Sequence, residues 1–276
     1  MILNSLFPDT TYANESGGDP DVIPELTYEE YLNFHRTYYH PSNSYIYLYG
    51  NMDMEEKLNW LDQEYLSAYD RKEVDSEIHL QKPFEQMHDI TKPYSIASNE
   101  STEDNTYLSY NKVIGTSLDE KLYLAFQILD YALLSAPGAP ITKALLEAGI
   151  GKDISGAYDS STYQPIFSIV AKNANEEQKA EFVKVIEDTL KAIVENGMDK
   201  KALEAGINYH EFRYREADFG GYPKGLMYGL QIFDSWLYDE TKPFIHVEAL
   251  DTFAFLKEQI NTGSVSYTHL TLPTIA

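Results

Sequence analysis

Histidine and glutamate are the side chains that could bind zinc here, because the chain has seven histidines and no cysteine. Zinc hydrolases use His-Glu-x-x-His or the inverse His-x-x-Glu-His, in which two histidines one helical turn apart bind the metal and the glutamate activates water. Neither string occurs in the sequence. His210-Glu211 is followed by a tyrosine where the first pattern needs its second histidine, and His246 lacks the Glu-His pair that the inverse pattern needs. The motif search therefore predicts no zinc site in this chain.

Two other histidines lie close together in the sequence. His35 and His40 could form a metal clip, or they could be a helix-face histidine and a turn histidine. Pro41 ends the helix after His40, because the residue before a proline disfavours the helical region, and this favours the second interpretation. His79 and His88 have no carboxylate partner at a useful spacing, and we expect both in solvent.

Other catalytic motifs are also absent from the sequence. The lack of cysteine excludes disulfide scaffolds, thiolate zinc sites and cysteine nucleophiles. Residues 16–20 (SGGDP) lack the Lys-Ser/Thr of a phosphate-binding loop and are interpreted as a turn. Gly220-Gly221 indicates a break between helices, and no Gly-x-Ser-x-Gly elbow occurs. By motifs alone, the chain has no active site.

The composition is that of an ordinary globular protein, with 276 residues, 43% hydrophobic and 24% charged. Lysine plus arginine number 21 against 44 acidic residues, so the net charge is 21 − 44 = −23. Such an acidic surface repels phosphate backbones and anionic lipids, so we expect no nucleic-acid and no membrane partner. No apolar run approaches the roughly 20 residues that span a bilayer. The N-terminus lacks the basic flank and apolar core of a signal peptide, so the expected compartment is the cytoplasm.

The first third of the chain predicts a loop, a helix, a strand and a second helix. Residues 1–26 are rich in turn formers and should lie as a loop on a neighbouring surface. Thr27 with Glu30 forms a capping-box pattern that opens a helix over residues 28–38, and residues 45–50 read as a strand. Asp53 opens the second helix. Helical spacing predicts these inward-facing side chains: Tyr31, Phe34, His35 and Tyr38, then Leu58, Leu61, Tyr65 and Leu66.

The rest of the chain predicts strands and helices in alternating groups. The strands are expected near 87–97, 106–114, 153–160 and 165–172. The helices are expected at 118–134, 141–148, from a cap at Asn175 to Asn196, from a cap at Asp199 to 216, at 223–238 and at 247–261. Two strands, helices, two strands and helices indicate an α+β fold, an antiparallel sheet with helices on one face.

Several motifs follow one another in a specific order along the chain. Residues 16–43 read SGGDPDVIPELTYEEYLNFHRTYYHPSN, preceded by Leu6-Phe7-Pro8-x-x-x-Tyr12. Further on come Pro137-x-x-Pro140-Ile-x-Lys-Ala-Leu-Leu-Glu-x-Gly-Ile-Gly151, Gln164-Pro-x-Phe-Ser168 and Gly220-x-x-Pro-Lys-Gly-Leu226. From about residue 5 to about residue 263, the chain resembles the pitrilysin/insulinase family of inverse-zincin metallopeptidases, most closely its presequence-protease branch.

The resemblance implies an architecture and a different role for each domain. Such enzymes are similar to a clamshell of four homologous α/β-roll domains, whose chamber admits peptides and excludes folded proteins. Their zinc is held by His-x-x-Glu-His and a more distal glutamate in the first domain, which would all lie upstream of Met1 here. The resemblance thus implies no catalytic and no metal-binding residue in this chain. His40, Pro41, Asn43 and Gly50 match the family pattern, and we expect them to be structural as helix stop, turn and strand end.

The same resemblance divides the chain. Residues 1–69 would be the C-terminal part of the first, catalytic-type α/β domain, 70–85 a charged linker, and 86–263 a nearly complete second, non-catalytic α/β domain. Residues 264–276 resemble the translation of a sequencing adapter and are expected to be a non-native tail. Met1 is then expected to be an internal or apparent start.

The functional expectation is a portion of a zinc metalloendopeptidase that degrades unfolded oligopeptides, with Zn²⁺ in the full-length enzyme and none in this chain, which should be inactive alone. Its expected partners are the remainder of the same polypeptide (the upstream zinc domain and the downstream half) and unfolded peptide substrates. One alternative is a non-catalytic scaffold or partner subunit of the same family, which upstream DNA lacking the zinc motif would favour. A weaker alternative is an unrelated acidic α+β interaction protein.

Overall fold

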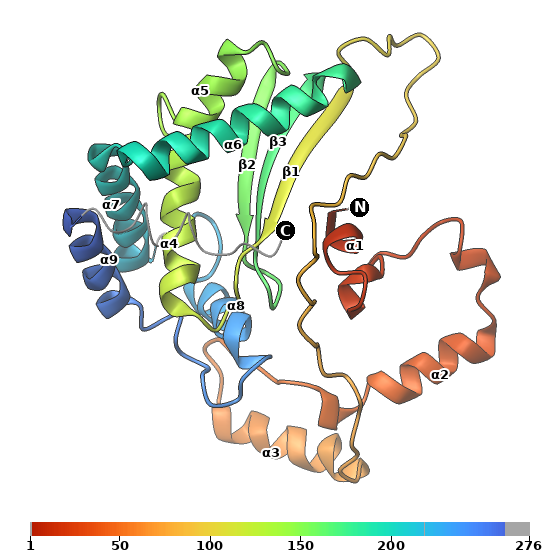
Figure 1. Ribbon diagram of the computed structural model, residues 1–276. Coiled ribbons are helices and arrows are strands. Elements are labelled where there is room, and N and C mark those ends of the chain that lie inside the picture. The colour runs from red at the N-terminus through yellow and green to blue at the C-terminus, as the bar shows by residue number, and fades with distance from the viewer. Residues whose placement is uncertain (1, 218, 263–276) are drawn as a thin grey trace.

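The centre of the computed structural model, which describes residues 2–217 and 219–262, is a three-stranded antiparallel sheet. Its strands are β1 (Thr106–Val113), β2 (Asp153–Asp159) and β3 (Ile166–Ala174), in the order β1-β3-β2. Helices α4 (Glu120–Asp130), α5 (Pro140–Glu147), α6 (Lys179–Asn196) and α7 (Lys200–Glu216) cover one face of this sheet, and α1 (Ile2–Leu6) lies on the other side (Figure 1). This arrangement confirms the α+β prediction. The predicted tail, residues 264–276, lies outside the described residues.

Alternation along β3 explains why the sheet buries one face under the helices. Phe167, Ile169 and Ala171 are buried in the main core. The residues between them in the strand are only partly buried, because successive side chains of a strand point to opposite faces. The strand predicted near residues 165–172 is confirmed. The core continues into α4 and the π-helical turn that follows it, where Leu129 and Leu133 are fully buried.

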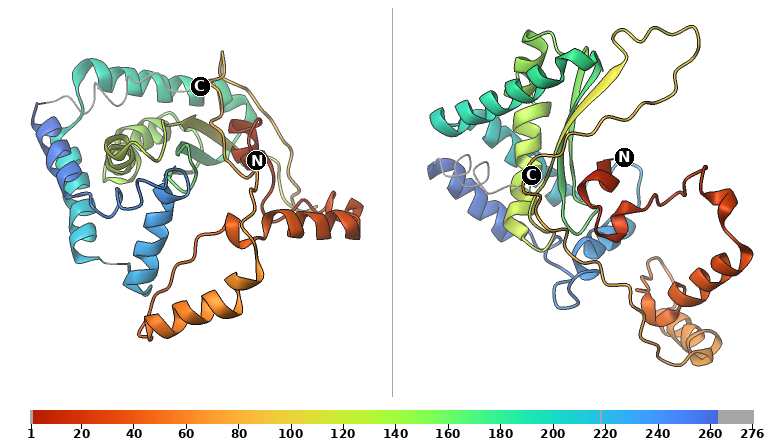
Figure 2. Two further views of the ribbon diagram at one scale, coloured as in Figure 1. Left: turned by 90° about the horizontal axis from the view of Figure 1, so that it is seen from below. Right: turned by 45° about the vertical axis from the view of Figure 1, so that its right-hand side comes forward.

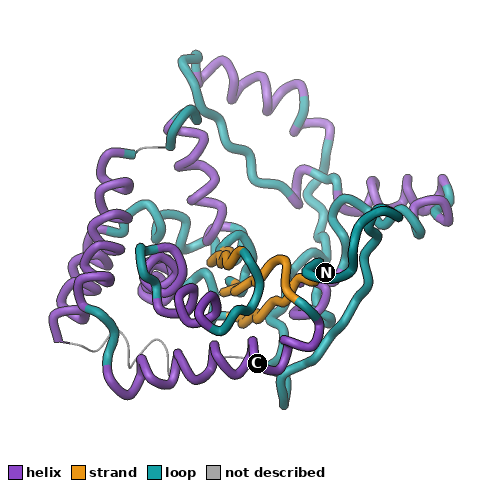
Figure 3. The backbone as a smooth tube through the Cα atoms, turned by 90° about the horizontal axis from the view of Figure 1, so that it is seen from above, coloured by secondary structure: helices purple, strands orange, loops and turns teal. Residues whose placement is uncertain are grey.

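Helices α4 to α9 and a π-helical turn follow or separate the strands of the sheet. They are α4 (Glu120–Asp130), a π-helical turn (Tyr131–Ser135), α5 (Pro140–Glu147), α6 (Lys179–Asn196), α7 (Lys200–Glu216), α8 (Lys224–Trp236) and α9 (Leu250–Thr262). Asn175 and Gln178 form a capping box around a 3-10 turn (Glu176–Gln178) that leads into α6. Asp199 caps α7 by accepting a hydrogen bond from the backbone N–H of Lys201. The predicted helices all occur, with shifts of a few residues at their ends. Seen end-on, the helices form an arc around the sheet (Figure 3).

The lead segment lies on the face of the sheet opposite the main core. It contains α1 (Ile2–Leu6) and two 3-10 turns (Thr11–Ala13 and Ile23–Glu25), so the prediction of a loop over residues 1–26 is only partly right. Phe7 is 1% exposed and packs against Val113 and Ile166. Burial of this phenylalanine, with Leu6 and Tyr12 packed beside it, stabilises the contact between the lead segment and the sheet.

Helices α2 (Tyr28–Tyr38) and α3 (Met54–Glu64) form as predicted, but their buried stripes do not. The capping box of Thr27 and Glu30 is present, and Asp53 caps α3 by accepting from the backbone N–H of Glu56. Tyr31 is 64% exposed and Leu58 54% exposed. The prediction of inward-facing residues on both helices is wrong for the described residues, because these helices stand away from the sheet and its helices (Figure 2).

Neither of two predicted strands, residues 45–50 and 87–97, is part of a sheet within the described residues. A strand needs a neighbour for its backbone hydrogen bonds, and the three strands pair only with one another. Residues 45–50 are extended and place their tyrosines against α8: the Tyr47 hydroxyl donates to the Gly225 carbonyl at 2.7 Å, and the Tyr45 ring lies 4.6 Å from Trp236. The prediction of strands there is therefore wrong.

Residues 70–85 carry no regular secondary structure, yet one residue of this stretch is buried. Gln81 is 3% exposed, its backbone N–H donates to Gln164 Oε1 at 2.6 Å, and its side-chain amide donates to Asp9 Oδ2 at 2.7 Å. The linker thus attaches to the turn before β3 and to the lead segment. The division of the chain into domains stays a prediction. Over the described part of the chain, every helix is too short or too polar to cross a membrane.

Gly229 should be required for the contact between residues 45–50 and α8. A methyl group there would lie 2.5 Å from Tyr47 Cε1, a distance at which the ring must move. We expect Gly229→Ala to release the segment and to speed chymotrypsin cleavage at Tyr45 to Tyr49 by roughly fivefold, the equivalent of about 1 kcal/mol. Gly221→Ala is the control, because a methyl group there meets nothing within 4 Å. Equal cleavage rates for both variants would contradict this prediction.

Candidate binding cavity

Three of the four residues that match the family pattern, His40, Pro41 and Asn43, lie in one turn, and Gly50 lies at the end of the segment 45–50. His40 Nδ1 accepts a hydrogen bond from the backbone N–H of Ser42 and so caps a 3-10 turn (Pro41–Asn43). Asn43 donates from its side chain to the Tyr38 carbonyl at 2.9 Å. Gly50 has φ +139°, a backbone conformation that glycine adopts far more readily than other residues. His40 and Asn43 thus make local contacts with the backbone, and Asn43 Oδ1 also accepts a hydrogen bond from the Ser76 hydroxyl.

The histidines considered as metal ligands do not come together. His35 stacks on Tyr39 at 4.7 Å, whereas the ring of His40 packs edge-on against Tyr69. His79 and His88 are exposed. Among residues 2–217 and 219–262, no three acidic or histidine side chains gather closely enough to hold a metal ion.

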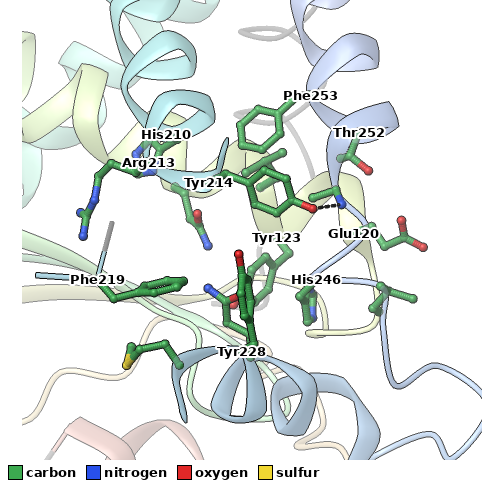
Figure 4. A pocket seen from close by; sticks show the side chains of 16 residues that line it. Glu120, Tyr123, His210, Arg213, Tyr214, Phe219, Tyr228, His246, Thr252 and Phe253 are labelled. Carbon is green, nitrogen blue, oxygen red and sulfur yellow. Dashed lines mark hydrogen bonds between the residues drawn. The ribbon is translucent and has the colours of Figure 1, made fainter. Parts of the chain in front are cut away.

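A cavity of about 330 Å³ lies between α4, α7, α8 and the segment leading into α9 (Figure 4). The rings of Tyr214 from α7, Phe219 from the loop before α8, and Tyr228 from α8 surround the same space in this view. The other lining residues are Glu120, Tyr123, Leu124, Gln127, His210, Arg213, Met227, Gln231, Ile245, His246, Ala249, Thr252 and Phe253. The cavity is therefore mainly aromatic and apolar, with a few polar groups.

Tyr123 fixes one wall of the cavity through a network of polar contacts. Its hydroxyl donates to Asp234 Oδ2 at 3.0 Å and accepts from Ser160 Oγ at 3.2 Å. Burial raises the pKa of Asp234 to about 6, although the hydrogen bond from Tyr123 acts in the opposite direction. The ring of Tyr123 stacks on that of His246, with centroids 3.9 Å apart.

Two residues of the lining carry a buried polar atom that has no hydrogen-bond partner among the described residues. These atoms are His246 Nε2 and Gln231 Oε1. His246 is 8% exposed, and burial lowers its pKa to about 4, against which a hydrogen bond with the backbone of Ser117 acts. At neutral pH the ring is uncharged, so one nitrogen donates and the other, Nε2, is an acceptor. Buried acceptors without a donor are uncommon.

The lining of the cavity suits the binding of a small ligand. It contains hydroxyls and two histidines; the hydroxyl of Tyr123 donates to Asp234 and that of Tyr214 donates to the Val247 carbonyl. His210 also lines the cavity, and its pKa is lowered, chiefly by burial. From the sequence, His210 and His246 could be considered only as zinc ligands. The residues next to each histidine can be read from the sequence, whereas the burial of its ring cannot.

His246 should make the fold sensitive to mild acid. Its folded-state pKa of about 4 lies below the ordinary value of 6.5, so its contribution to stability is present above pH 6.5 and is lost as the pH falls towards 4. The loss reaches at most about 3 kcal/mol. We expect His246→Phe to lose less stability than the original chain between pH 7 and pH 4.5 in urea unfolding. His79→Phe, in the exposed linker, should behave as the original chain, and the same pH slope for all three would contradict the assignment.

Comparisons with known proteins match nearly the whole chain. A family model described as "Peptidase M16 inactive domain" matches residues 25–209. The "Protein HypA" of Clostridium perfringens is 51% identical over 90% of this chain and 25% of its own length. "Presequence protease 1, chloroplastic/mitochondrial" of Arabidopsis thaliana is 36% identical over 93% of this chain and 24% of its own length. The chain thus spans about a quarter of the length of these curated relatives.

Solved structures are similar in fold. The peptidase M16 inactive domain from Pseudomonas fluorescens superposes with a TM-score of 0.57 and 16% identity, covering 96% of this chain and 59% of that one. The M16-like peptidase from Alicyclobacillus acidocaldarius gives a TM-score of 0.53 at 17% identity, covering 97% and 60%. At such low identity these similarities support the fold alone.

Proposed function

This chain belongs to the M16 peptidase family, which confirms the resemblance to the pitrilysin/insulinase metallopeptidases, and we propose that it is a non-catalytic portion of a longer zinc metalloendopeptidase that degrades unfolded oligopeptides in an enclosed chamber. The observation that carries the proposal is the match of residues 25–209 to the inactive-domain model together with 36% identity to a presequence protease over 93% of the chain. In the proposed enzyme this portion would form part of the chamber wall.

Residues 2–217 and 219–262 form no zinc site. Neither zinc motif occurs in the sequence, and the described side chains bring together no set of three candidate ligands. The Zn²⁺ of the proposed enzyme would therefore be bound by residues outside this chain, and no step of peptide hydrolysis is assigned to any residue here. This chain would shape part of the chamber wall and support the rest of the enzyme.

The apolar surface of α2 and α3 supports the proposed partner, which is the remainder of the same polypeptide. Phe34 and Trp60 are each 58% exposed, and neither helix contains a buried residue. Large exposed apolar patches mark interaction surfaces. Because relatives are about four times as long as this chain, flanking polypeptide is the occupant that we propose for this surface. The cytoplasm is the compartment that we propose for the enzyme.

The experiment that tests the proposed function uses the longer gene product that contains this chain. We expect that product to cleave an unfolded, quenched fluorescent peptide, to lose this activity with a chelator and to regain it with zinc. A folded protein with the same amino-acid composition as that peptide should resist cleavage. An upstream reading frame without His-x-x-Glu-His, or a longer product that fails to cleave peptides, would contradict the proposal and would favour a scaffold subunit.

A further inference from the structure

Two of the sequence motifs meet at the turn that joins β2 to β3, and the proposed wall function leaves this meeting unexplained. The turn contains Tyr163 and Gln164, of which Gln164 begins the Gln164-Pro-x-Phe-Ser168 motif. The lead segment, which carries the Leu6-Phe7-Pro8-x-x-x-Tyr12 motif, contacts this turn, and so does Gln81 of the linker. Three parts of the chain that are far apart in the sequence are therefore joined at one place.

Gln81 forms a pair of hydrogen bonds with each of two partners. Its backbone N–H donates to Gln164 Oε1 at 2.6 Å, and its carbonyl accepts from Gln164 Nε2 at 3.4 Å. Its side-chain Nε2 donates to Asp9 Oδ2 at 2.7 Å, and its Oε1 accepts from the backbone N–H of Asp9 at 2.9 Å. Gln81 is 3% exposed and Gln164 is 4% exposed, so the loss of either pair leaves buried polar groups unsatisfied.

A second contact joins the lead segment to the same turn. The Tyr12 hydroxyl accepts from the backbone N–H of Tyr163 at 3.1 Å and lies 2.8 Å from the Tyr238 hydroxyl. The rings of Tyr163 and Tyr238 stack with centroids 4.3 Å apart. The lead segment is thus bonded to the linker at Asp9 and to the turn at Tyr12.

The lead segment and the linker have few buried apolar contacts to hold them in place. Residues 70–85 carry no regular secondary structure and are mostly exposed. The lead segment packs on the sheet in a small cluster around Phe7, Val113 and Ile166, separate from the main core. Segments with few buried apolar contacts open at a lower free energy than the core does. Because Gln81 is bonded to Asp9 and to Gln164, departure of either segment breaks hydrogen bonds of the other.

We propose that Gln81 is a latch that makes residues 2–13 of the lead segment and residues 78–84 of the linker open and close on the sheet as one unit. The lead segment covers the face of the sheet opposite the main core, so opening of the latch exposes Val113 and Ile166. The inference does not depend on the proposed peptidase function, because every residue of the latch lies in this chain.

The test is hydrogen exchange, followed by mass spectrometry, on the 276-residue chain. Gln81→Glu keeps the shape of the side chain, but its carboxylate faces that of Asp9 and has no proton to donate. We expect the amides of residues 2–13 and 78–84 to exchange about tenfold faster, while those of β3 keep their protection. Gln63→Glu, on the exposed surface of α3, makes the same chemical change and should exchange as the original chain does.

A double variant restores the missing donor. Asp9→Asn combined with Gln81→Glu places an amide opposite the new carboxylate, and we expect exchange to return to within about twofold of the original rate. Unchanged exchange in Gln81→Glu, faster exchange in the linker alone, or a double variant that stays unprotected would overturn the proposal. Loss of protection in β3 as well would also overturn it, because the junction would then be part of the core and not a separate latch.

Discussion

Replacing Phe253 by alanine is expected to lower the free energy of unfolding by about 4 kcal/mol, the loss typical of a fully buried phenylalanine. Phe253 is 2% exposed and belongs to the main core. Its ring lies 5.5 Å from that of Tyr214, so it connects α9 to α7. Truncation removes apolar contact with both helices and enlarges the cavity beside them. Urea unfolding followed by circular dichroism measures the loss.

The control for this experiment is another phenylalanine of the same helical region. Phe212 on α7 is 62% exposed, and we expect Phe212→Ala to change stability by less than about 0.5 kcal/mol, as surface substitutions do. A Phe253→Ala variant as stable as Phe212→Ala would mean that α9 does not pack as the structure shows.

Replacing Gly156 by alanine is expected to cost about 3 kcal/mol, the upper range for overpacking a core. Gly156 lies in β2 opposite Ile169 of β3. A methyl group there would lie 2.1 Å from Leu134 Cδ1 and 2.9 Å from the Ser168 carbonyl oxygen. Because the second atom belongs to the backbone of the sheet, a side-chain rotation cannot relieve the clash.

Gly221→Ala makes the same chemical change in open space, where nothing lies within 4 Å of the added methyl group. We expect it to leave the thermal midpoint unchanged, while Gly156→Ala lowers that midpoint by several degrees. Equal midpoints for the two variants would show that the helical turn carrying Leu134 does not approach β2 so closely.

Helices and strands were predicted correctly where the pattern that marks them lies within the element itself. Thr27 with Glu30 forms the capping box that its spacing indicates, and Asn175, predicted as a cap, forms a capping box with Gln178 in the structure. Phe167, Ile169 and Ala171 alternate as expected for a half-buried strand and face the core. Capping and alternation depend on a few neighbouring residues, so one sequence suffices to read them.

Strand pairing and helix packing depend on residues that are distant in the sequence, and the predictions of these two features were wrong. Residues 45–50 have the composition of a strand, but a strand also needs a partner edge, and in the structure Tyr47 packs on the glycine face of α8. The periodicity of Phe34 in α2 indicated a buried face, but periodicity does not say whether a covering surface is present. The cavity was missed for the same reason, since its residues come from α4, α7, α8 and the segment before α9.

The central claim is that this chain is a non-catalytic portion of an M16 peptidase. Its most direct test is zinc content by elemental mass spectrometry, with cleavage of a quenched fluorescent peptide, on the chain as given. We expect less than stoichiometric zinc and no cleavage above the rate of the peptide in buffer. Stoichiometric zinc with chelator-sensitive cleavage would contradict it, and His35, His40 and His210 would then be the first residues to replace.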